Sequence, residues 1–238
     1  MIESLVQKLS HYMDLTAEEK QVLADAITRT SDIGKGNDII SEGQKPNEVH
    51  LMVEGWACRY KLLENGEHHI MAYLLPGDLC DVHIAILDQM DHSIRTLTPA
   101  RVAYIPHETI SNIMEHHFRL ARALFWTTLV DEAVLREWLV NAGSRAADKR
   151  LAHVFCELLL RSRAAGLSDD NGFPMPLTQE ELGDTMGLTT VHTNRVLQKL
   201  RNQGLVTFDR KRMEILDWER MTAFAQFTPN YLHLKKSA

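Results

Sequence analysis

The spacing of apolar residues changes twice along the chain, and each change predicts a different kind of structure. Over residues 3–29 apolar side chains recur at three- and four-residue steps, which predicts two short helices. From about Asp32 to Pro106 the apolar runs are short and are separated by turn signals. From Glu108 onward the helical spacing returns. This order of elements predicts an α+β fold in which a strand-rich half precedes a helical half.

The strand-rich half has the spacing of a β-sandwich, roll or barrel. Asn65-Gly66 is the strongest hairpin signal of the chain, because it separates two β-rich runs over residues 56–63 and 68–75. Pro76-Gly77-Asp78 predicts the next turn.

A long helix is predicted from Phe118 to Asn141, ending where Gly143-Ser144 breaks it. At 1.5 Å per residue it would span roughly 36 Å, which is long for a helix of a small domain. Its narrow apolar stripe suits either a seam between two helices or packing on its own domain. The carboxylate of Asp131 lies in that stripe and needs a partner or water. The stripe comprises Leu120, Leu124, Thr128, Leu135 and Trp138.

The segment Leu177–Val206 predicts two short helices joined by a tight turn. Thr178 and Glu181 form a capping box at the start of the first helix, and Gly187 ends that helix. Gly204 ends the second helix. Two short helices with a turn of three or four residues are typical of a DNA-binding helix-turn-helix.

The polar face of the second helix favours DNA binding over an ordinary solvated surface. Thr189 or Thr190 can cap this helix, and it carries no acidic residue before Asn202. Arginine can bond bidentately to guanine, and asparagine to adenine. The donors and cations on this face are Thr189, Thr190, His192, Asn194, Arg195, Gln198, Lys199 and Arg201.

The rest of the C-terminal half predicts the elements that would surround such a motif. A helix is expected over residues 147–165 and a polar loop over 168–176. Two strands around residues 209–212 predict a β-wing, and the tail from Thr228 is expected to be loose.

The net charge of −6 is unevenly divided. From Arg145 onward there are 14 Lys/Arg against 11 Asp/Glu, whereas the preceding part has 12 against 21. An acidic half joined to a mildly basic half fits a chain in which only the C-terminal half contacts DNA. No apolar run approaches the ~20 residues of a membrane span, and no cleavable leader is evident, so a cytoplasmic location is expected.

The stretch TQEELGDTMGLTTVHTNRVLQKLRNQGLV resembles the C-terminal signature of the Crp/Fnr superfamily of bacterial transcription regulators. Residues 148–160 resemble the first helix of that family's winged-helix domain. The resemblance implies a β-roll sensor (a double-stranded β-helix or jelly-roll-like domain) over 1–115, a dimerisation helix over 116–143 and a winged helix-turn-helix over 144–238. It also implies a homodimer joined by the long helix, and a pseudo-palindromic DNA site.

Carried over residue by residue, the resemblance assigns base reading to four positions: Thr190, Val191, Asn194 and Arg195. Val191 stands where many members have a glutamate that binds a cytosine amino group, which predicts a changed consensus and a contact with a thymine methyl instead. Phosphate contacts are expected from Thr178, Gln179, Thr189, His192 and Lys199.

The sensor half departs from the family's cyclic-nucleotide pocket. Gly77-Asp78-Leu79 replaces the Gly-Glu-Leu that holds the ribose, and His92-Ser93 replaces the Arg-Ser that holds the phosphate. Without the guanidinium, a cyclic phosphate lacks its main charge-assisted bonds, which argues against cyclic AMP. The candidate pocket residues are Asp81, His83, His92 and Ser93.

The sequence predicts no cofactor, no metal site and no catalytic residue. Three scattered cysteines do not suffice for an iron–sulfur cluster. A thiol sensor on Cys58 or Cys80, a haem- or metal-dependent gas or redox sensor, an unidentified small-molecule effector and regulation without ligand all stay open. A cupin-like metalloenzyme is a distant alternative, because the adjacent His68 and His69 would point to opposite faces of a strand. RNA polymerase is a further partner if the protein is an activator, and the sequence leaves activation and repression open.

Overall fold

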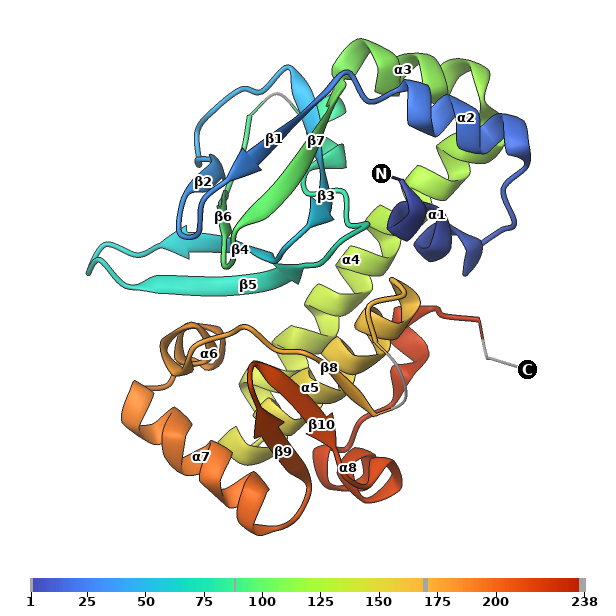
Figure 1. Ribbon diagram of the computed structural model, residues 1–238. Coiled ribbons are helices and arrows are strands. Elements are labelled where there is room, and N and C mark those ends of the chain that lie inside the picture. The colour runs from blue at the N-terminus through green and yellow to red at the C-terminus, as the bar shows by residue number, and fades with distance from the viewer. Residues whose placement is uncertain (1, 88, 169–170, 236–238) are drawn as a thin grey trace. The chain divides into compact units, whose positions relative to one another are not determined.

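The computed structural model describes residues 2–87, 89–168 and 171–235, which form two compact units. The first unit contains the chain up to Lys61, Met71–Glu132 and the residues from His233, and the second contains Leu62–Ile70 and Ala133–Leu232. Helices and sheets occur together, which confirms the predicted α+β class (Figure 1). Within the described ranges no helix is both long and apolar enough to cross a membrane.

Two short helices precede the sheets, as predicted: α1 (Glu3–Ser10) and α2 (Ala17–Asp25). Thr16 caps α2, because its Oγ1 accepts from the N–H of Glu19 at 3.1 Å. The carboxylate of Glu19 accepts from the N–H of Thr16 at 2.8 Å and completes the capping box.

The strands form two sheets of a jelly-roll-like domain, which confirms the predicted roll. The first sheet has the order β1 (Arg29–Ile33), β7 (Ala100–Pro106) and β3 (Glu48–Glu54). The second has the order β2 (Asp38–Ile40), β6 (Ser93–Thr96), β4 (Ala57–Leu62) and β5 (His68–Leu74). The hairpin predicted at Asn65-Gly66 joins β4 to β5, and Gly66 adopts the positive φ of 83° that a tight turn requires.

One apolar core lies between the sheets and the helices packed on them. Val49, Ile94 and Val102 are fully buried in it. It also takes side chains from α3 (His107–His116) and from the beginning of α4 (Phe118–Ser144). The short helix η1 (Val82–Ala85) adds Val82 and Ile84.

Helix α4 differs from the prediction in two respects. It continues through Gly143 to Ser144, and α5 (Ala147–Ala164) begins shortly afterwards. Leu120, Leu124 and Trp138 were predicted to face a partner, but they are 0%, 2% and 9% exposed inside the protomer. More than one side of this helix carries apolar residues, and the protomer itself buries three of the five residues that the prediction assigned to the seam.

The other two predicted seam residues, Thr128 and Leu135, are not buried in this way: Thr128 is half-buried and Leu135 is exposed. The partner that Asp131 needed is Arg59 of β4, whose guanidinium NH1 lies 2.9 Å from the Asp131 Oδ2.

The second unit surrounds α5, which is buried along most of its length. Its other elements are α6 (Gln179–Met186), α7 (Thr190–Asn202), α8 (Trp218–Ala225), the 3₁₀ helix η2 (Pro229–Leu232) and a sheet with the order β8 (Gly172–Pro174), β10 (Arg212–Ile215) and β9 (Val206–Asp209). The predicted helix-turn-helix and two-stranded wing are confirmed by α6, α7, β9 and β10.

Two predictions about irregular segments in this unit were wrong. The expected loop at 168–176 contains β8, because Phe173 is fully buried and pairs with Met213 of β10. The tail expected to be loose from Thr228 forms η2, in which Tyr231 is buried. The Tyr231 hydroxyl donates to the Glu157 carboxylate of α5 at 2.9 Å, so a side-chain contact fixes η2 on α5, whereas residues 236–238 lie outside the described part of the tail.

Candidate nucleic-acid interface and sensor site

The helix-turn-helix is built by local capping at both helices. Thr178 Oγ1 accepts from the N–H of Glu181 at 3.1 Å, and the Glu181 carboxylate accepts from the N–H of Thr178 at 2.7 Å. Gly187 ends α6 in the left-handed conformation, with a φ of 63°. Thr189 then caps α7, because its Oγ1 accepts from the N–H of His192 at 3.3 Å. The short chain between the two caps fixes α7 relative to α6.

The close approach of the turn to α6 depends on Gly183, a residue that the sequence analysis missed. A Cβ at this position would lie 2.6 Å from the carbonyl oxygen of Leu188 and 3.3 Å from the hydroxyl of Thr193. The same Thr193 is fully buried, and its hydroxyl donates to the carbonyl of Thr189 at 3.1 Å. A glycine inside a short helix was the available signal, since glycine there costs helix stability unless packing requires it.

The four base-reading candidates lie on α7. Thr190, Val191 and Arg195 are exposed, and the Val191 side chain, 64% exposed, is one of the exposed apolar residues of the unit. Asn194 is half-buried, and its side-chain amide donates to the side-chain Oε1 of Gln179 at 3.1 Å. The arrangement therefore leaves three of the four side chains open to a ligand and uses one N–H of the fourth to join α7 to α6.

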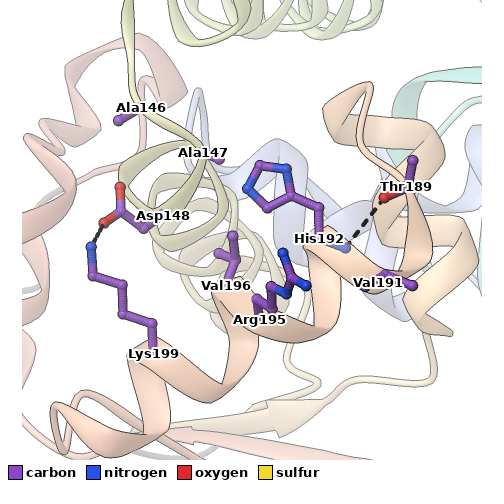
Figure 2. A pocket seen from close by; sticks show the side chains of 9 residues that line it. All are labelled: Ala146, Ala147, Asp148, Thr189, Val191, His192, Arg195, Val196 and Lys199. Atoms are coloured by element: carbon purple, nitrogen blue, oxygen red, sulfur yellow. Dashed lines mark hydrogen bonds and ion pairs between the residues drawn. The ribbon is translucent and has the colours of Figure 1, made fainter.

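A groove of about 630 Å³ runs beside α7 and is lined by Ala146, Ala147, Asp148, Thr189, Val191, His192, Arg195, Val196 and Lys199. Figure 2 shows His192 and Arg195 next to each other on α7, with Lys199 turned toward Asp148 of α5. The phosphate candidates Thr189, His192 and Lys199 thus share this groove, whereas Thr178 and Gln179 lie at the beginning of α6.

The ammonium group of Lys199 forms an ion pair with Asp148, a contact that the sequence did not reveal because the residues are 51 positions apart. Burial disfavours the charged form of Asp148, but the hydrogen bonds from Lys199 and from the N–H of Lys149 outweigh it and lower the pKa of Asp148. The carboxylate is therefore ionised at neutral pH and offsets the charge of Lys199 on this face.

The wing ends in a two-residue turn formed by Arg210 and Lys211. Both have a positive φ, 44° and 64°, which strains residues other than glycine. Asp209 pairs with Arg212 across the turn, and both cations of the turn are exposed. The hairpin thus presents two positive side chains at its tip.

In the sensor unit, the candidate Asp81 is engaged by its own protein. It is fully buried, its Oδ1 accepts from the N–H of His50 at 2.7 Å, and its Oδ2 lies 2.6 Å from His50 Nδ1. This pair joins the chain before η1 to β3, so Asp81 holds the fold together at this point.

The positions that would hold a cyclic nucleotide are also occupied. Ser93 is buried, and its hydroxyl accepts from the N–H of Glu42 at 2.9 Å. Asp78 accepts from the N–H of Leu75 at 2.7 Å and forms an ion pair with Lys8 of α1. Both side chains therefore stabilise turns of the roll.

The other two sensor candidates, His83 and His92, lie side by side with ring centroids 5.7 Å apart. Burial is the main cause that lowers the pKa of each imidazole below its usual value, and the charge of Arg59 adds to it. Asp91, which the sequence analysis did not single out, lies with its Oδ1 2.6 Å from His92 Nδ1. Both imidazoles are accordingly neutral at pH 7.

The cysteines are poorly suited to thiol sensing. Cys58, Cys80 and Cys156 are all buried and unbridged. Burial raises the pKa of the Cys80 thiol well above its usual value, and the nearby Asp81 raises it further. A buried neutral thiol is a weak nucleophile.

Comparisons with known proteins match both units. The family model of the cyclic nucleotide-binding domain matches residues 32–117, and that of the Crp-like helix-turn-helix domain matches residues 149–224. The transcriptional activator protein Anr of Pseudomonas aeruginosa is 24% identical over 213 residues, which are 90% of this chain and 87% of that protein. The transcriptional activator protein FnrL of Cereibacter sphaeroides is 26% identical over 190 residues, 78% of this chain and 76% of that protein.

Among solved structures, FixK2 from Bradyrhizobium japonicum has a similar fold. The match has a TM-score of 0.74 at 21% identity and covers 82% of this chain and 96% of FixK2. The two domain matches, in this order along one chain, agree with the roll and the capped helix-turn-helix described above. The protein therefore belongs to the Crp/Fnr superfamily of DNA-binding transcription regulators.

Proposed function

We propose that this regulator binds a pseudo-palindromic DNA site as a homodimer, with α7 of each protomer in a major groove. The observation that supports the proposal best is the exposed, acid-free face of α7, held on α6 by the turn at Gly183. Arg195 can bond bidentately to guanine, and Val191 can contact a thymine methyl. Thr190 and Asn194 complete the base-reading set, and the protein acts in the cytoplasm.

Contacts to the DNA backbone come from the groove beside α7 and from the beginning of α6. Thr178, Gln179, Thr189 and His192 offer hydroxyl, amide and imidazole groups to phosphate oxygens. The side chain of Lys199 is 54% exposed and forms an ion pair with Asp148. To bind a DNA phosphate, Lys199 would have to exchange Asp148 for the phosphate as its ionic partner. This exchange reduces the net gain from Lys199 but keeps its sensitivity to salt.

The homodimer is supported by apolar residues that α4 leaves exposed. Phe118, Phe125, Leu129, Leu135 and Leu139 are between 43% and 76% exposed. Their spacing along the helix approximates the heptad of a two-helix seam, and exposed apolar stripes of this kind are typical of interfaces. The proposed seam therefore retains the predicted residues Leu135 and Thr128. In place of the buried Leu120, Leu124 and Trp138 it contains the exposed residues Phe118, Phe125, Leu129 and Leu139.

The sensor unit is proposed to work without a cyclic nucleotide. The side chains of Asp78 and Ser93 already satisfy backbone N–H groups, and His92 is neutral where the family's phosphate-binding arginine would stand. A cyclic phosphate would therefore meet a neutral imidazole in place of that arginine.

The experiment is fluorescence anisotropy against a selected pool of pseudo-palindromic duplexes at two salt concentrations. We expect Arg195→Ala to lower discrimination between the selected site and random DNA by about 1–3 kcal/mol, and Lys199→Ala to weaken both alike and to flatten the salt dependence. Arg220→Ala, which removes an exposed cation from α8, is the matched control and should change neither. Equal losses on specific and random DNA for Arg195→Ala would refute the base-reading assignment.

A further inference from the structure

Three side chains that can bind a metal ion meet between η1 and β6 in the first unit. His83 lies in η1, and Asp91 and His92 lie immediately before β6. One potential ligand atom from each residue lies within 4.8 Å of those of the other two. His92 is buried, His83 is half-buried and Asp91 is exposed, so the group is anchored inside the roll and opens toward solvent.

The buried histidine of this group has an unsatisfied nitrogen. His92 is 8% exposed, and its Nδ1 is held by the Asp91 carboxylate at 2.6 Å. Its Nε2 is buried and has no hydrogen-bond partner among the described residues. Buried polar atoms are almost always paired, so an unpaired ring nitrogen beside a second imidazole indicates a missing partner. A bound ion, or a water on that ion, would supply it.

We propose that His83, Asp91 and His92 bind one divalent transition-metal ion. Two imidazoles and a carboxylate suit Zn²⁺, Fe²⁺ or Co²⁺, whereas Mg²⁺ and Ca²⁺ prefer sites made of oxygen ligands. Ligand bonds of about 2.0–2.2 Å place ligand atoms roughly 3–3.5 Å apart. For an ion on the free Nε2 of His92, the exposed Asp91 carboxylate must therefore turn away from Nδ1 of the same ring and rotate toward His83. With three protein ligands, the ion keeps positions for water or for an exogenous ligand.

This inference goes beyond DNA binding, because it gives the sensor unit a ligand of its own. The proposed site lies close in sequence to Cys80, whose carbonyl is bonded to the guanidinium of Arg59 that also binds α4. Cys80, just before η1, accepts through its carbonyl oxygen from Arg59 NH2 at 2.8 Å, and the same guanidinium binds Asp131 of α4. An ion that orders η1 would therefore act next to the hydrogen bonds that hold this helix.

The test is a titration of untagged, chelator-treated full-length protein with Co²⁺, followed by its visible absorption and by competition with Zn²⁺. We expect saturation at one ion per chain, with the absorption bands of nitrogen- and oxygen-ligated Co²⁺. His83→Ala and Asp91→Ala should each weaken binding at least about tenfold. The control His116→Ala removes an exposed histidine of α3 outside the group and should bind like the wild type.

The variants of His83 and Asp91 test the site without the risk of misfolding that a change at the buried His92 carries. His92→Gln alters a buried residue and can impair folding, but Asp91 is exposed and His83 is half-buried, so circular dichroism should show both of those variants folded. The proposal would be overturned by the absence of stoichiometric binding to the wild type, or by wild-type affinity in folded His83→Ala. DNA anisotropy of the metal-free protein is measured separately, so failure here leaves the DNA-binding proposal intact.

Discussion

Replacing Gly183 by alanine should loosen the helix-turn-helix, although the same change normally stabilises a helix. The new Cβ would lie 2.6 Å from the carbonyl oxygen of Leu188, far closer than an ordinary contact of roughly 3.4 Å. That carbonyl is part of a tight turn, because the N–H of Leu188 donates to the carbonyl of Gly183 at 3.0 Å. The clash can be relieved only by moving the turn and α7 away from α6.

The magnitude follows from two opposing effects. Overpacking a tightly packed site costs about 1–3 kcal/mol, and a backbone neighbour places this site in the upper half of that range. Replacing glycine by alanine inside a helix normally raises the free energy of unfolding by about 1 kcal/mol, which offsets part of this cost. The free energy of unfolding should therefore fall by about 1–2 kcal/mol, and DNA affinity should fall as well because α7 is displaced.

Gly143 provides the matched control, since it also lies inside a helix but a Cβ there would meet no described atom within 4 Å. Gly143→Ala should raise the free energy of unfolding by about 0.5–1 kcal/mol. Urea denaturation followed by circular dichroism measures both variants, and anisotropy measures their DNA binding. If Gly183→Ala were stabilised as much as Gly143→Ala, with unchanged DNA affinity, the argument from close packing would be wrong.

Three further changes test other parts of the structure. Leu139→Glu places a charge on the proposed seam and should convert the dimer to a monomer in analytical ultracentrifugation, whereas Leu216→Glu, at an exposed leucine outside α4, should leave the mass unchanged. Burial lowers the pKa of His153 to about 4, so the unfolded state binds more protons between pH 4 and pH 6.5, and stability should fall by about 2 kcal/mol from pH 7 to pH 5. His153→Phe should lose that part of the pH dependence in urea titrations, and an undiminished slope would contradict the assignment. Tyr231→Phe leaves the buried Glu157 without one donor and should lower the free energy of unfolding by about 1–3 kcal/mol, which a wild-type urea midpoint would disprove.

Local signals predicted the elements that local interactions stabilise. Both helices of the helix-turn-helix follow from Thr178, Thr189 and Gly187, because caps and left-handed glycines act within one turn of the chain. The β4–β5 hairpin follows from Asn65-Gly66 for the same reason.

Elements that depend on distant partners escaped the same analysis. Strand β8 contains a glycine and a proline, and it exists because Phe173 pairs with Met213 and is buried. The turn η2 is held by the hydroxyl of Tyr231 on Glu157, 74 positions earlier. Of the proposed metal-binding group, the sequence indicated His83 and His92 as pocket candidates but not Asp91, because no local pattern shows that its carboxylate lies beside both imidazoles.

The two apolar flanks of α4 show why periodicity finds a helix more readily than it finds its partners. Leu120 and Leu124 belong to the core of the roll, while Phe125 and Leu129 lie exposed on the same turns. The sequence contains both flanks with the same helical spacing, so it cannot tell which one the protomer buries. Only the packing of the roll decides which flank remains for a second chain.

Arg59 connects this helix to the part of the roll that carries the proposed metal-binding group. Its side chain is 11% exposed, and its guanidinium donates to the carbonyls of Leu79 and Cys80 as well as to the Asp131 carboxylate. A ligand that moves the chain between Leu79 and His83 must either carry this guanidinium along or break its hydrogen bonds, and both outcomes change what Asp131 contacts. Because Asp131 lies on α4 between the exposed Leu129 and Leu135, Arg59 is a polar link between the proposed seam and the proposed metal-binding group, in addition to the apolar packing of Leu120 and Leu124 on the roll.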